Sequence, residues 1–312
     1  VRHFLNMYEI LDEKYITYTE HAEDGRFLIH LYCVDPSGNI SMCIGQGRNA
    51  VFFSATLLPI QYFKEMLTGN TEENAIYAES PFDPSKRRLI ISRDVSSRYT
   101  RRNVSEFSRI CRYILAITAE KPGNYMVFFP SYSFMESVYN QMEGIAHEEL
   151  ADSRLKIVMQ SSSMKESEKE AFLQNFEITE KSSAEDDGWE TLIGFCVTGG
   201  IFSEGIDLKN DSLIGAFIVG TGLPMICNER QLLRQYFDEN GKNGYQYAYV
   251  YPGMNKVLQA AGRVIRTEED RGMITLLDDR FLTAEYQRLF PREWEVFYQT
   301  NVDNVGESAA EF

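Results

Sequence analysis

The sequence predicts an α/β fold built on a mostly parallel sheet with helices on both faces. From residue 124 onward, short apolar runs alternate with longer amphipathic segments, and most of these runs are continuous rather than interrupted by polar residues. Continuous apolar strands separated by helices are typical of a parallel sheet that is covered on both sides. Ligands of such sheets bind beyond the carboxyl ends of the strands, so we expect most of the polar motifs there.

The first part of the chain is less regular than the rest. Residues 35–39 read Asp-Pro-Ser-Gly-Asn, which predicts a turn, and Pro59 and Gly69 are suited to the start and the end of a helix. The elements that we expect are a helix over residues 1–20, strands Arg26–Val34 and Ile40–Ile44, a short buried strand Ala50–Phe53 and a helix Pro59–Leu67.

The second part has a clear strand–helix rhythm. In chain order we expect strand Leu89–Ile91, helix Val104–Ala119, strand Tyr125–Phe129, helix Ser133–Met142, strand Lys156–Met159, helix Lys165–Phe176, strands Leu192–Val197, Ile214–Val219 and Tyr247–Tyr251, helix Met254–Arg266 and strand Met273–Leu277. The acidic stretch 179–188 predicts a surface loop.

Composition excludes several classes of protein. The 312 residues are 44% hydrophobic and 25% charged, which is ordinary for a globular chain, and no stretch approaches the ~20 apolar residues of a membrane span. The five cysteines form no Cys-x-x-Cys pair and the four histidines show no ligand spacing, so we expect neither a disulfide framework nor a metal site. A reducing, cytoplasmic environment fits this cysteine usage.

For binding a polyanion, the distribution of charge along the chain matters more than the net charge. The net charge of −15 argues against a polyanionic partner. Between Lys86 and Arg112, however, basic residues greatly outnumber acidic ones. Such a cluster is usually only a solvated face, yet this stretch, with Arg101 and Arg102 near its centre, is where we expect a phosphate backbone to lie.

Residues 259–266, Gln-Ala-Ala-Gly-Arg-Val-Ile-Arg, carry the most informative pattern. If the helix continues through them, its apolar stripe is buried and Gln259, Arg263 and Arg266 share the opposite face. Two guanidinium groups presented together are suited to phosphate oxygens. Gly262 would lie within the helix, where it costs about 1 kcal/mol relative to Ala. Taken alone, this arrangement is more often just a solvated basic face.

Three further motifs follow expected strands. Ser54-Ala55-Thr56-Leu57 can relay movement between loops, or Thr56 can simply cap a helix. Ser131 can cap the next helix or meet a phosphate, and Tyr132 can stack on a base or belong to an aromatic core. The Gly-rich loop at 199–207 brings backbone close to a ligand and adds the acceptors Glu204 and Asp207, although such loops are often coincidental.

Together, in this order and spacing, the four segments resemble motifs III, IV, V and VI of superfamily 2 DNA helicases of the XPD/DinG type. The segments Gly222-Leu223-Pro224, Tyr247-Ala248-Tyr249 and Leu277-Asp278-Asp279-Arg280 are also similar to that family. The similarity extends over essentially the whole chain. The pair formed by Ser-Glu-Gly-Ile-Asp and Gln-Ala-Ala-Gly-Arg-Val-Ile-Arg is specific, because chance co-occurrence at this spacing is improbable.

The resemblance implies a motor of two RecA-like lobes, with ATP between them and single-stranded DNA crossing both. By that analogy Arg263 and Arg266, with Gln259, act on the transferring γ-phosphate. The match also places three groups of residues: Glu204, Gly205 and Asp207 between nucleotide and DNA, Ser54 and Thr56 in the coupling of hydrolysis to lobe movement, and Ser131 and Tyr132 on the DNA.

The sequence contains no Gly-x-x-x-x-Gly-Lys-Ser/Thr phosphate loop and no Asp-Glu-Ala-His-like box. By the resemblance we expect residues 1–56 to be the tail of the first lobe and residues 57–312 to be the second lobe. The rest of the first lobe, with most of the ATP and Mg²⁺ contacts and any iron–sulfur cluster, is then expected upstream. The expected partners are that lobe and single-stranded DNA or duplex junctions, in DNA repair, with no membrane.

Two alternatives stay open at this point. One is a non-catalytic nucleic-acid-binding module with the same fold, against which the intact Gln259, Arg263 and Arg266 count. The other is an α/β enzyme of another class, such as a transferase. Asp278 and Asp279 are the nearest paired carboxylates, but neighbours on a strand point to opposite faces and are poorly placed to act together.

Overall fold

The structure, a computed structural model, describes residues 2–149, 155–177, 191–202 and 212–312. The chain forms two compact units. The first comprises Val1–Ala78 and Pro224–Pro252, and the second comprises Glu79–Leu223 and Gly253–Phe312. The expected division into lobes 1–56 and 57–312 stays a prediction.

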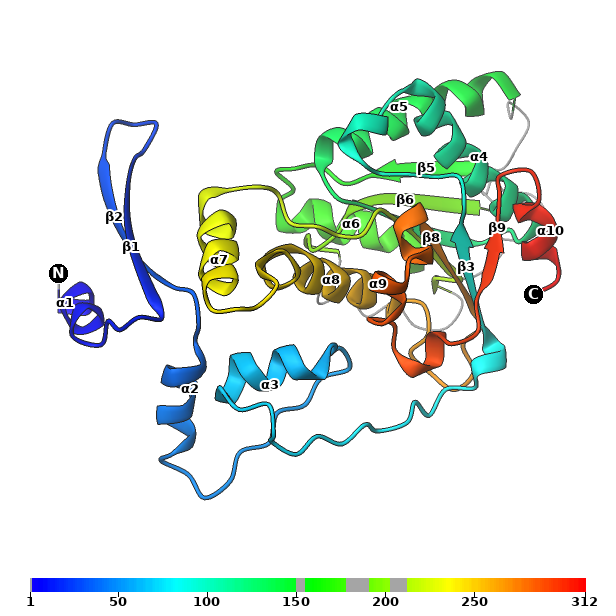
Figure 1. Ribbon diagram of the computed structural model, residues 1–312. Coiled ribbons are helices and arrows are strands. Elements are labelled where there is room, and N and C mark those ends of the chain that lie inside the picture. Colours follow the sequence, from blue (N-terminus) through cyan, green and yellow to red (C-terminus); the bar gives the residue numbers. More distant parts are fainter. Residues whose placement is uncertain (1, 150–154, 178–190, 203–211) are drawn as a thin grey trace. The chain divides into compact units, whose positions relative to one another are not determined.

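The second unit is built on a seven-stranded sheet. All of its pairings are parallel, in the order β5-β6-β4-β7-β8-β3-β9 (Figure 1). The strands are β3 (Arg87–Ser92), β4 (Asn124–Phe129), β5 (Leu155–Met159), β6 (Thr191–Val197), β7 (Gly215–Val219), β8 (Gly272–Leu277) and β9 (Tyr298–Thr300). The predicted parallel α/β fold is confirmed.

Helices cover both faces of this sheet, as the sequence predicts. The α-helices are α4 (Val104–Glu120), α5 (Tyr132–Glu149), α6 (Glu166–Glu177), α8 (Tyr251–Ala261, which begins in the first unit), α9 (Ala284–Gln287) and α10 (Val305–Ala310). Single 3-10 turns are η1 (Pro84–Lys86), η2 (Tyr99–Arg101), η5 (Asp279–Leu282) and η6 (Arg292–Trp294). In Figure 1, α4 and α5 lie on one side of the sheet and α6 and α8 on the other.

The alternation of side chains along β4 shows how the two faces are filled. Tyr125, Val127 and Phe129 belong to one hydrophobic core with residues of α4, α5 and α10. Met126 and Phe128 are also buried but lie outside that core, as expected for the opposite face of a strand. On that opposite face, Gly194 of β6 lies directly against the rings of two phenylalanines of α6.

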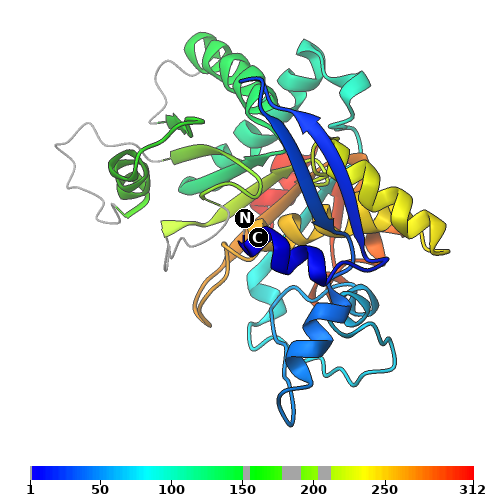
Figure 2. The same cartoon turned by 90° about the vertical axis from the view of Figure 1, so that its left-hand side faces the viewer.

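The first unit contains a two-stranded antiparallel ribbon and several helices (Figure 2). The elements are α1 (Arg2–Glu9), β1 (Tyr15–His21), β2 (Phe27–Cys33), α2 (Ser37–Ile44), α3 (Ile60–Thr68), α7 (Asn228–Glu239) and the π-helix η4 (Gln246–Val250). The predicted helix at residues 59–67 is confirmed, and it ends at Gly69 in the left-handed conformation, with a φ of 69°.

Three expectations for the first 60 residues are wrong. The helix expected over residues 1–20 ends at Glu9, because Tyr15–Thr19 are all aromatic or β-branched residues and pair as a strand. Residues 40–44 are helical: the Asp35 carboxylate accepts from the Ser37 backbone, so the expected turn starts a helix instead. Residues 50–53 form no strand, since no strand of the described residues pairs with them, and Phe53 is 89% exposed.

Two expectations near residue 250 are also wrong. Residues 247–251 form the π-helix and the start of α8 rather than a strand, because an apolar, aromatic run of that length is ambiguous when all of its side chains are buried or half-buried. The helix expected to reach Arg266 ends at Ala261.

Tight helix–sheet contact at Gly194 gives a test of this packing. A Cβ at that position would come within 2.6 Å of the Phe176 ring, so Gly194→Ala is expected to lower the free energy of unfolding by about 1–3 kcal/mol. Gly144, on α5, has open space around it, and Gly144→Ala is expected to raise stability by about 0.5–1 kcal/mol. Denaturant melts measure both, and equal shifts would contradict the packing.

Candidate functional site

Parallel alignment places the carboxyl ends of all seven strands at one edge of the sheet, which we call the carboxyl edge. Ser131 and Tyr132 follow β4 there, Gly199 and Gly200 follow β6, and Asp278 follows β8. The segment with Arg263 and Arg266 precedes β8 and therefore lies at the opposite, amino edge. The expectation that the four motifs follow strand ends is wrong for this segment, and also for Ser54–Thr56, because residues 50–53 form no strand.

The arginine segment, residues 259–266, is held in place by hydrogen bonds of the backbone at its end. Gly262 lies in a turn after α8, so Arg263 and Arg266 do not share a helix face with Gln259. The buried Asp270 carboxylate accepts from the Arg266 and Thr267 backbones at 2.7 and 2.8 Å, which closes the turn. Both guanidinium-bearing residues are half-buried at the surface. Neither lies in the core, as a contact with an external phosphate requires.

A buried contact holds this segment against the sheet. Val264 is 2% exposed, and its side chain occupies the space where a Cβ of Gly272 would lie. Gly272 is the first residue of β8. The position of the arginines at the amino edge is thus fixed by packing as well as by the Asp270 hydrogen bonds.

The Gly-rich loop is described only in part. Glu204, Gly205 and Asp207 lie outside the described residues. Gly199 has a φ of 73°, and a Cβ there would lie 3.0 Å from the Lys256 side chain of α8. Glycine therefore allows both this backbone conformation and the approach of that lysine.

A buried glutamine joins two of the predicted motifs. Gln160, 2% exposed, donates from Nε2 to the Tyr132 hydroxyl at 2.9 Å and accepts from the Val197 backbone at 3.0 Å. Burial raises the pKa of Tyr132, whose hydroxyl stays neutral. The Ser131 hydroxyl accepts from the Phe134 backbone at 3.4 Å, as a helix cap does. Sequence reasoning missed Gln160; its only signal is a polar residue directly after an apolar strand.

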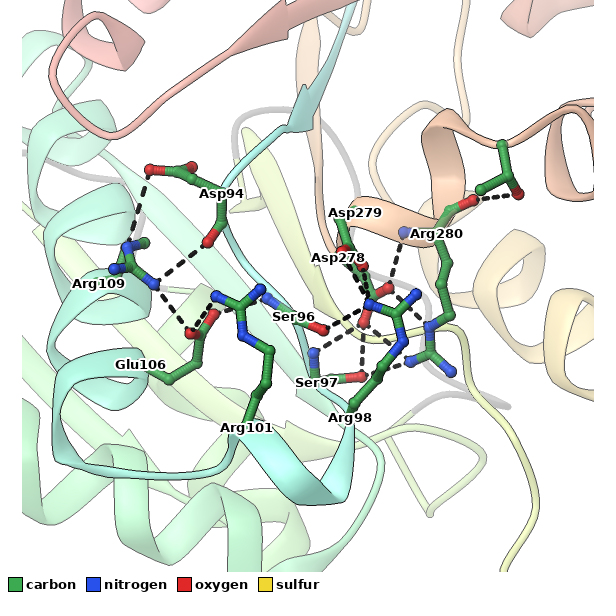
Figure 3. Close-up of polar contacts among 11 residues, drawn as sticks. Asp94, Ser96, Ser97, Arg98, Arg101, Glu106, Arg109, Asp278, Asp279 and Arg280 are labelled. Atoms are coloured by element: carbon green, nitrogen blue, oxygen red, sulfur yellow. Dashed lines mark hydrogen bonds and ion pairs between the residues drawn. The ribbon is translucent and has the colours of Figure 1, made fainter.

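The loop between β3 and α4, residues 93–103, is anchored at the carboxyl end of β8 (Figure 3). The buried Asp278 carboxylate accepts from the Ser97 backbone and hydroxyl at 2.9 and 2.7 Å, and from Arg280 at 2.8 Å. Burial alone would raise the pKa of Asp278, but Arg280 and the Ser97 donors outweigh it and hold the pKa below its usual value.

A second buried carboxylate fixes the same loop from α4. Glu106 accepts from the Ser96 backbone at 2.6 Å and forms ion pairs with Arg101 and Arg109 at 3.1 and 2.8 Å (Figure 3). Arg98, on the same loop, contacts both oxygens of Asp279 at 2.8 Å. Asp278 and Asp279 thus bind different partners, so this pair does not act as a joint acid–base site.

These contacts change the interpretation of the basic stretch. Several of its charges are already paired within the chain, including Arg101. The Arg102 guanidinium lies 4.5 Å from the Phe134 ring centre and 5.8 Å from that of Tyr99, and burial lowers the pKa of Arg102. Contact of Arg101 and Arg102 with DNA stays a prediction.

Ser54 and Thr56 belong to the first unit. The Ser54 hydroxyl accepts from the Thr56 backbone at 3.2 Å, and the two hydroxyls lie 3.4 Å apart. Ser54 is exposed and follows the unpaired residues 50–53. The two residues form a local turn, and their predicted coupling role stays a prediction.

The part of the chain that the structure describes has neither a metal-binding cluster nor a membrane-spanning helix. No three His, Cys, Asp or Glu side chains there are grouped to hold a metal ion. No described helix is both long and apolar enough to cross a membrane.

Comparison with known proteins identifies the class. The family model described as the helicase C-terminal domain matches residues 114–297, more than half of the chain, and the chain belongs to this family. The matched range contains β4–β8 and the whole arginine segment. This match and the relatives below support the XPD/DinG type of superfamily 2 helicases that the sequence resembles.

Three relatives are similar over most of the chain. A probable ATP-dependent helicase of Methanocaldococcus jannaschii is 22% identical over 89% of the chain, and the regulator of telomere elongation helicase 1 of Mus musculus is 28% identical over 92%. The ATP-dependent DNA helicase XPD of Sulfolobus acidocaldarius is 26% identical over 76%. The matches span 43%, 25% and 40% of those proteins, so the chain corresponds to less than half of each.

Solved structures agree on the fold. An XPD helicase structure is matched with a TM-score of 0.63 over 95% of this chain and 50% of that one, at 19% identity. A second, of XPD without ligand, has the same TM-score and covers 56% of that chain. The second unit therefore has the RecA-like fold that the sequence resemblance implied.

The buried Asp278 carboxylate gives a stability prediction. Asp278→Asn leaves the Arg280 guanidinium without its buried charged partner, and we expect the free energy of unfolding at pH 7 to fall by about 3 kcal/mol. The folded-state pKa is below the unfolded value of about 3.9, so the carboxylate stabilises the fold above that value and this contribution disappears as the pH falls through the folded-state pKa.

The gap in melting temperature between wild type and Asp278→Asn should accordingly narrow below about pH 4. Asp279→Asn is the matched control: its carboxylate is 29% exposed and pairs with the exposed Arg98, so it should cost less than about 1 kcal/mol. Equal destabilisation by the two variants would show that the buried network does not anchor the loop.

Proposed function

We propose that this chain is the C-terminal motor lobe of an ATP-dependent DNA helicase, in which ATP hydrolysis drives movement along single-stranded DNA and unwinding of duplexes during DNA repair. The observation that carries the proposal is the family match over residues 114–297, which includes the intact sequence Gln-Ala-Ala-Gly-Arg-Val-Ile-Arg. The names of the three relatives, all of them helicases, support it.

In this proposal Arg263 and Arg266 stabilise the charge that develops on the γ-phosphate during transfer, and Gln259 orients the reacting groups. Phosphoryl transfer depends on positioning and charge stabilisation, and an arginine is suited to both because its planar fork stays charged. The half-burial of both residues and their firmly held backbone support this role, since a donor fixed before the reaction needs little reorganisation.

The carboxyl edge takes the DNA in this proposal. Ser131 and Tyr132 would contact the strand, with Glu204, Gly205 and Asp207 linking it to the nucleotide and Ser54 and Thr56 relaying hydrolysis to lobe movement. The Gln160 bridge supports a connection between the two loops, because it ties Tyr132 to the backbone that leads into the Gly-rich loop.

ATP and Mg²⁺ would be held mainly by polypeptide outside this chain. Bound Mg²⁺ neutralises charge on the β- and γ-phosphates. The described residues do not fit such a site by themselves, and the sequence contains no phosphate loop. The proposal therefore assigns to this chain only the arginines that stabilise charge on the γ-phosphate, and not the phosphate-binding loop or the Mg²⁺ ligands.

Arg266→Lys in the complete protein tests the arginine role. Lysine keeps the charge but lacks the planar fork, so DNA-stimulated hydrolysis should fall by about 10³-fold while the affinity for DNA changes little. Phosphate release and DNA anisotropy measure the two quantities. Arg271→Lys, the same exchange at an exposed site on the following turn, is the control and should retain activity. Turnover of Arg266→Lys within a few-fold of wild type would disprove the assignment.

A second test uses the 312-residue chain alone. Because it lacks a phosphate loop, we expect no DNA-stimulated ATP hydrolysis above background and no tight ATP binding. Phosphate release and calorimetric titration with MgATP check this. Robust turnover by the purified chain would mean that its own residues hold the triphosphate, and the two-lobe proposal would have to be abandoned.

A further inference from the structure

One exposed aromatic side chain lies on the carboxyl-edge loop described above. Tyr99 is 85% exposed and begins the turn η2. Single exposed aromatic residues are common on protein surfaces and need no explanation. Tyr99 differs because the backbone just before it is held by two buried carboxylates, Glu106 at Ser96 and Asp278 at Ser97. A ring on such a backbone costs less entropy to immobilise against a ligand than a ring on a loose loop.

The loop crosses the ends of several strands. The Asp279 backbone donates to the Val95 carbonyl at 2.8 Å, and the Asp278 carboxylate holds Ser97, both at the end of β8. Ser97 then fills the space beside Gly220, where β7 ends, and Gly220 in turn lies near Pro130, where β4 ends. The loop thus runs from β3 across β8 and β7 toward the turn that carries Ser131.

Arg102 links this loop to the turn after β4. Its guanidinium lies 5.8 Å from the Tyr99 ring centre and 4.5 Å from the ring centre of the buried Phe134. The Phe134 backbone donates to the Ser131 hydroxyl. Tyr99 and Ser131 are therefore connected through Arg102 and Phe134.

An exposed aromatic ring beside positive charge is suited to binding an unpaired base and its phosphate. Every base has a π-face, and stacking on an aromatic side chain is sequence-tolerant. The adjacent Arg102, and Arg101 at 45% exposure, place positive charge beside the ring, where a sugar–phosphate chain would pass. Their internal contacts reduce what charge alone can contribute, so the ring is the larger source of binding energy at this place.

We propose that Tyr99 is a base-stacking platform, so that single-stranded nucleic acid bound at the carboxyl edge places one unpaired base on this ring and its backbone runs on toward Ser131. This inference rests on the proposed function, because it requires that the chain bind single strands. It adds a contact outside the four sequence motifs and outside the family-matched range, which begins at residue 114.

The test is the affinity of the 312-residue chain for a fluorescently labelled thymidine strand, measured by anisotropy. Tyr99→Ala should weaken binding about 5- to 100-fold, while Tyr99→Phe, which keeps the ring, should stay within about twofold of wild type. The slope of affinity against salt should not change, because no phosphate contact is removed. Val104→Ala, a truncation of an apolar side chain that is 65% exposed at the start of α4, is the control.

A strand with abasic sites separates stacking from other effects. On that strand Tyr99→Ala and wild type should bind equally, since there is no base for the ring to hold. Equal binding of wild type, Tyr99→Ala and Tyr99→Phe to the thymidine strand would overturn the stacking role and leave the helicase proposal intact. No binding of single strands by the wild-type chain would overturn the DNA role of the carboxyl edge itself, and this inference with it.

Discussion

The parallel alignment of the seven strands is the constraint on which the rest of the second unit depends. Each crossover must return the chain from one edge of the sheet to the other, so the two edges acquire different loops. The carboxyl edge collects Ser97, Ser131, Gly199 and Asp278 from four strands that are far apart in sequence. The arginine segment precedes β8 and lies at the amino edge. In the proposed function the nucleotide-facing arginines thus lie at the amino edge, and the DNA-facing residues Ser131 and Tyr132 lie at the carboxyl edge.

Several arginines of this protein form ion pairs with acidic residues of the same chain, which leaves less of their charge for a partner. The chain has 46 acidic and 31 basic residues, yet the loop between β3 and α4 is rich in arginine. Asp278 and Glu106 are almost fully buried, and each accepts from both a loop backbone and arginine side chains. A buried carboxylate is tolerable only when it is paired in this way, and removing one partner is costly. Within the basic stretch, Arg101 and Arg109 are counter-charges of Glu106, while Arg98 and Arg88 pair with the more exposed Asp279 and Glu311.

The sequence was sufficient for the elements whose periodicity is unambiguous. The buried strands from β3 to β8 and the helices α4, α5 and α6 were predicted closely, because continuous apolar runs bounded by polar segments have few alternatives. Helix α7 (Asn228–Glu239) was not predicted. Residues 50–53 and 247–251 are also apolar and aromatic, but whether such a segment becomes a strand depends on a partner strand elsewhere in the chain. The end of α8 was missed because the stop comes from Asp270, a side chain nine residues beyond Ala261.

The residues of the candidate site also differ in how far the sequence could predict them. Motif residues could be found by type and spacing, whereas the residues that hold them could not. Gln160 and Glu106 are single polar residues in otherwise ordinary segments, and only the fold reveals that each bonds to two or three partners. Tyr99 carries no sequence signal that distinguishes it from any other surface tyrosine. Its interest comes from a preceding backbone fixed by buried acids and from its exposure of 85%, which leaves the Tyr99 ring available to a ligand while Phe134 is buried at 2% exposure.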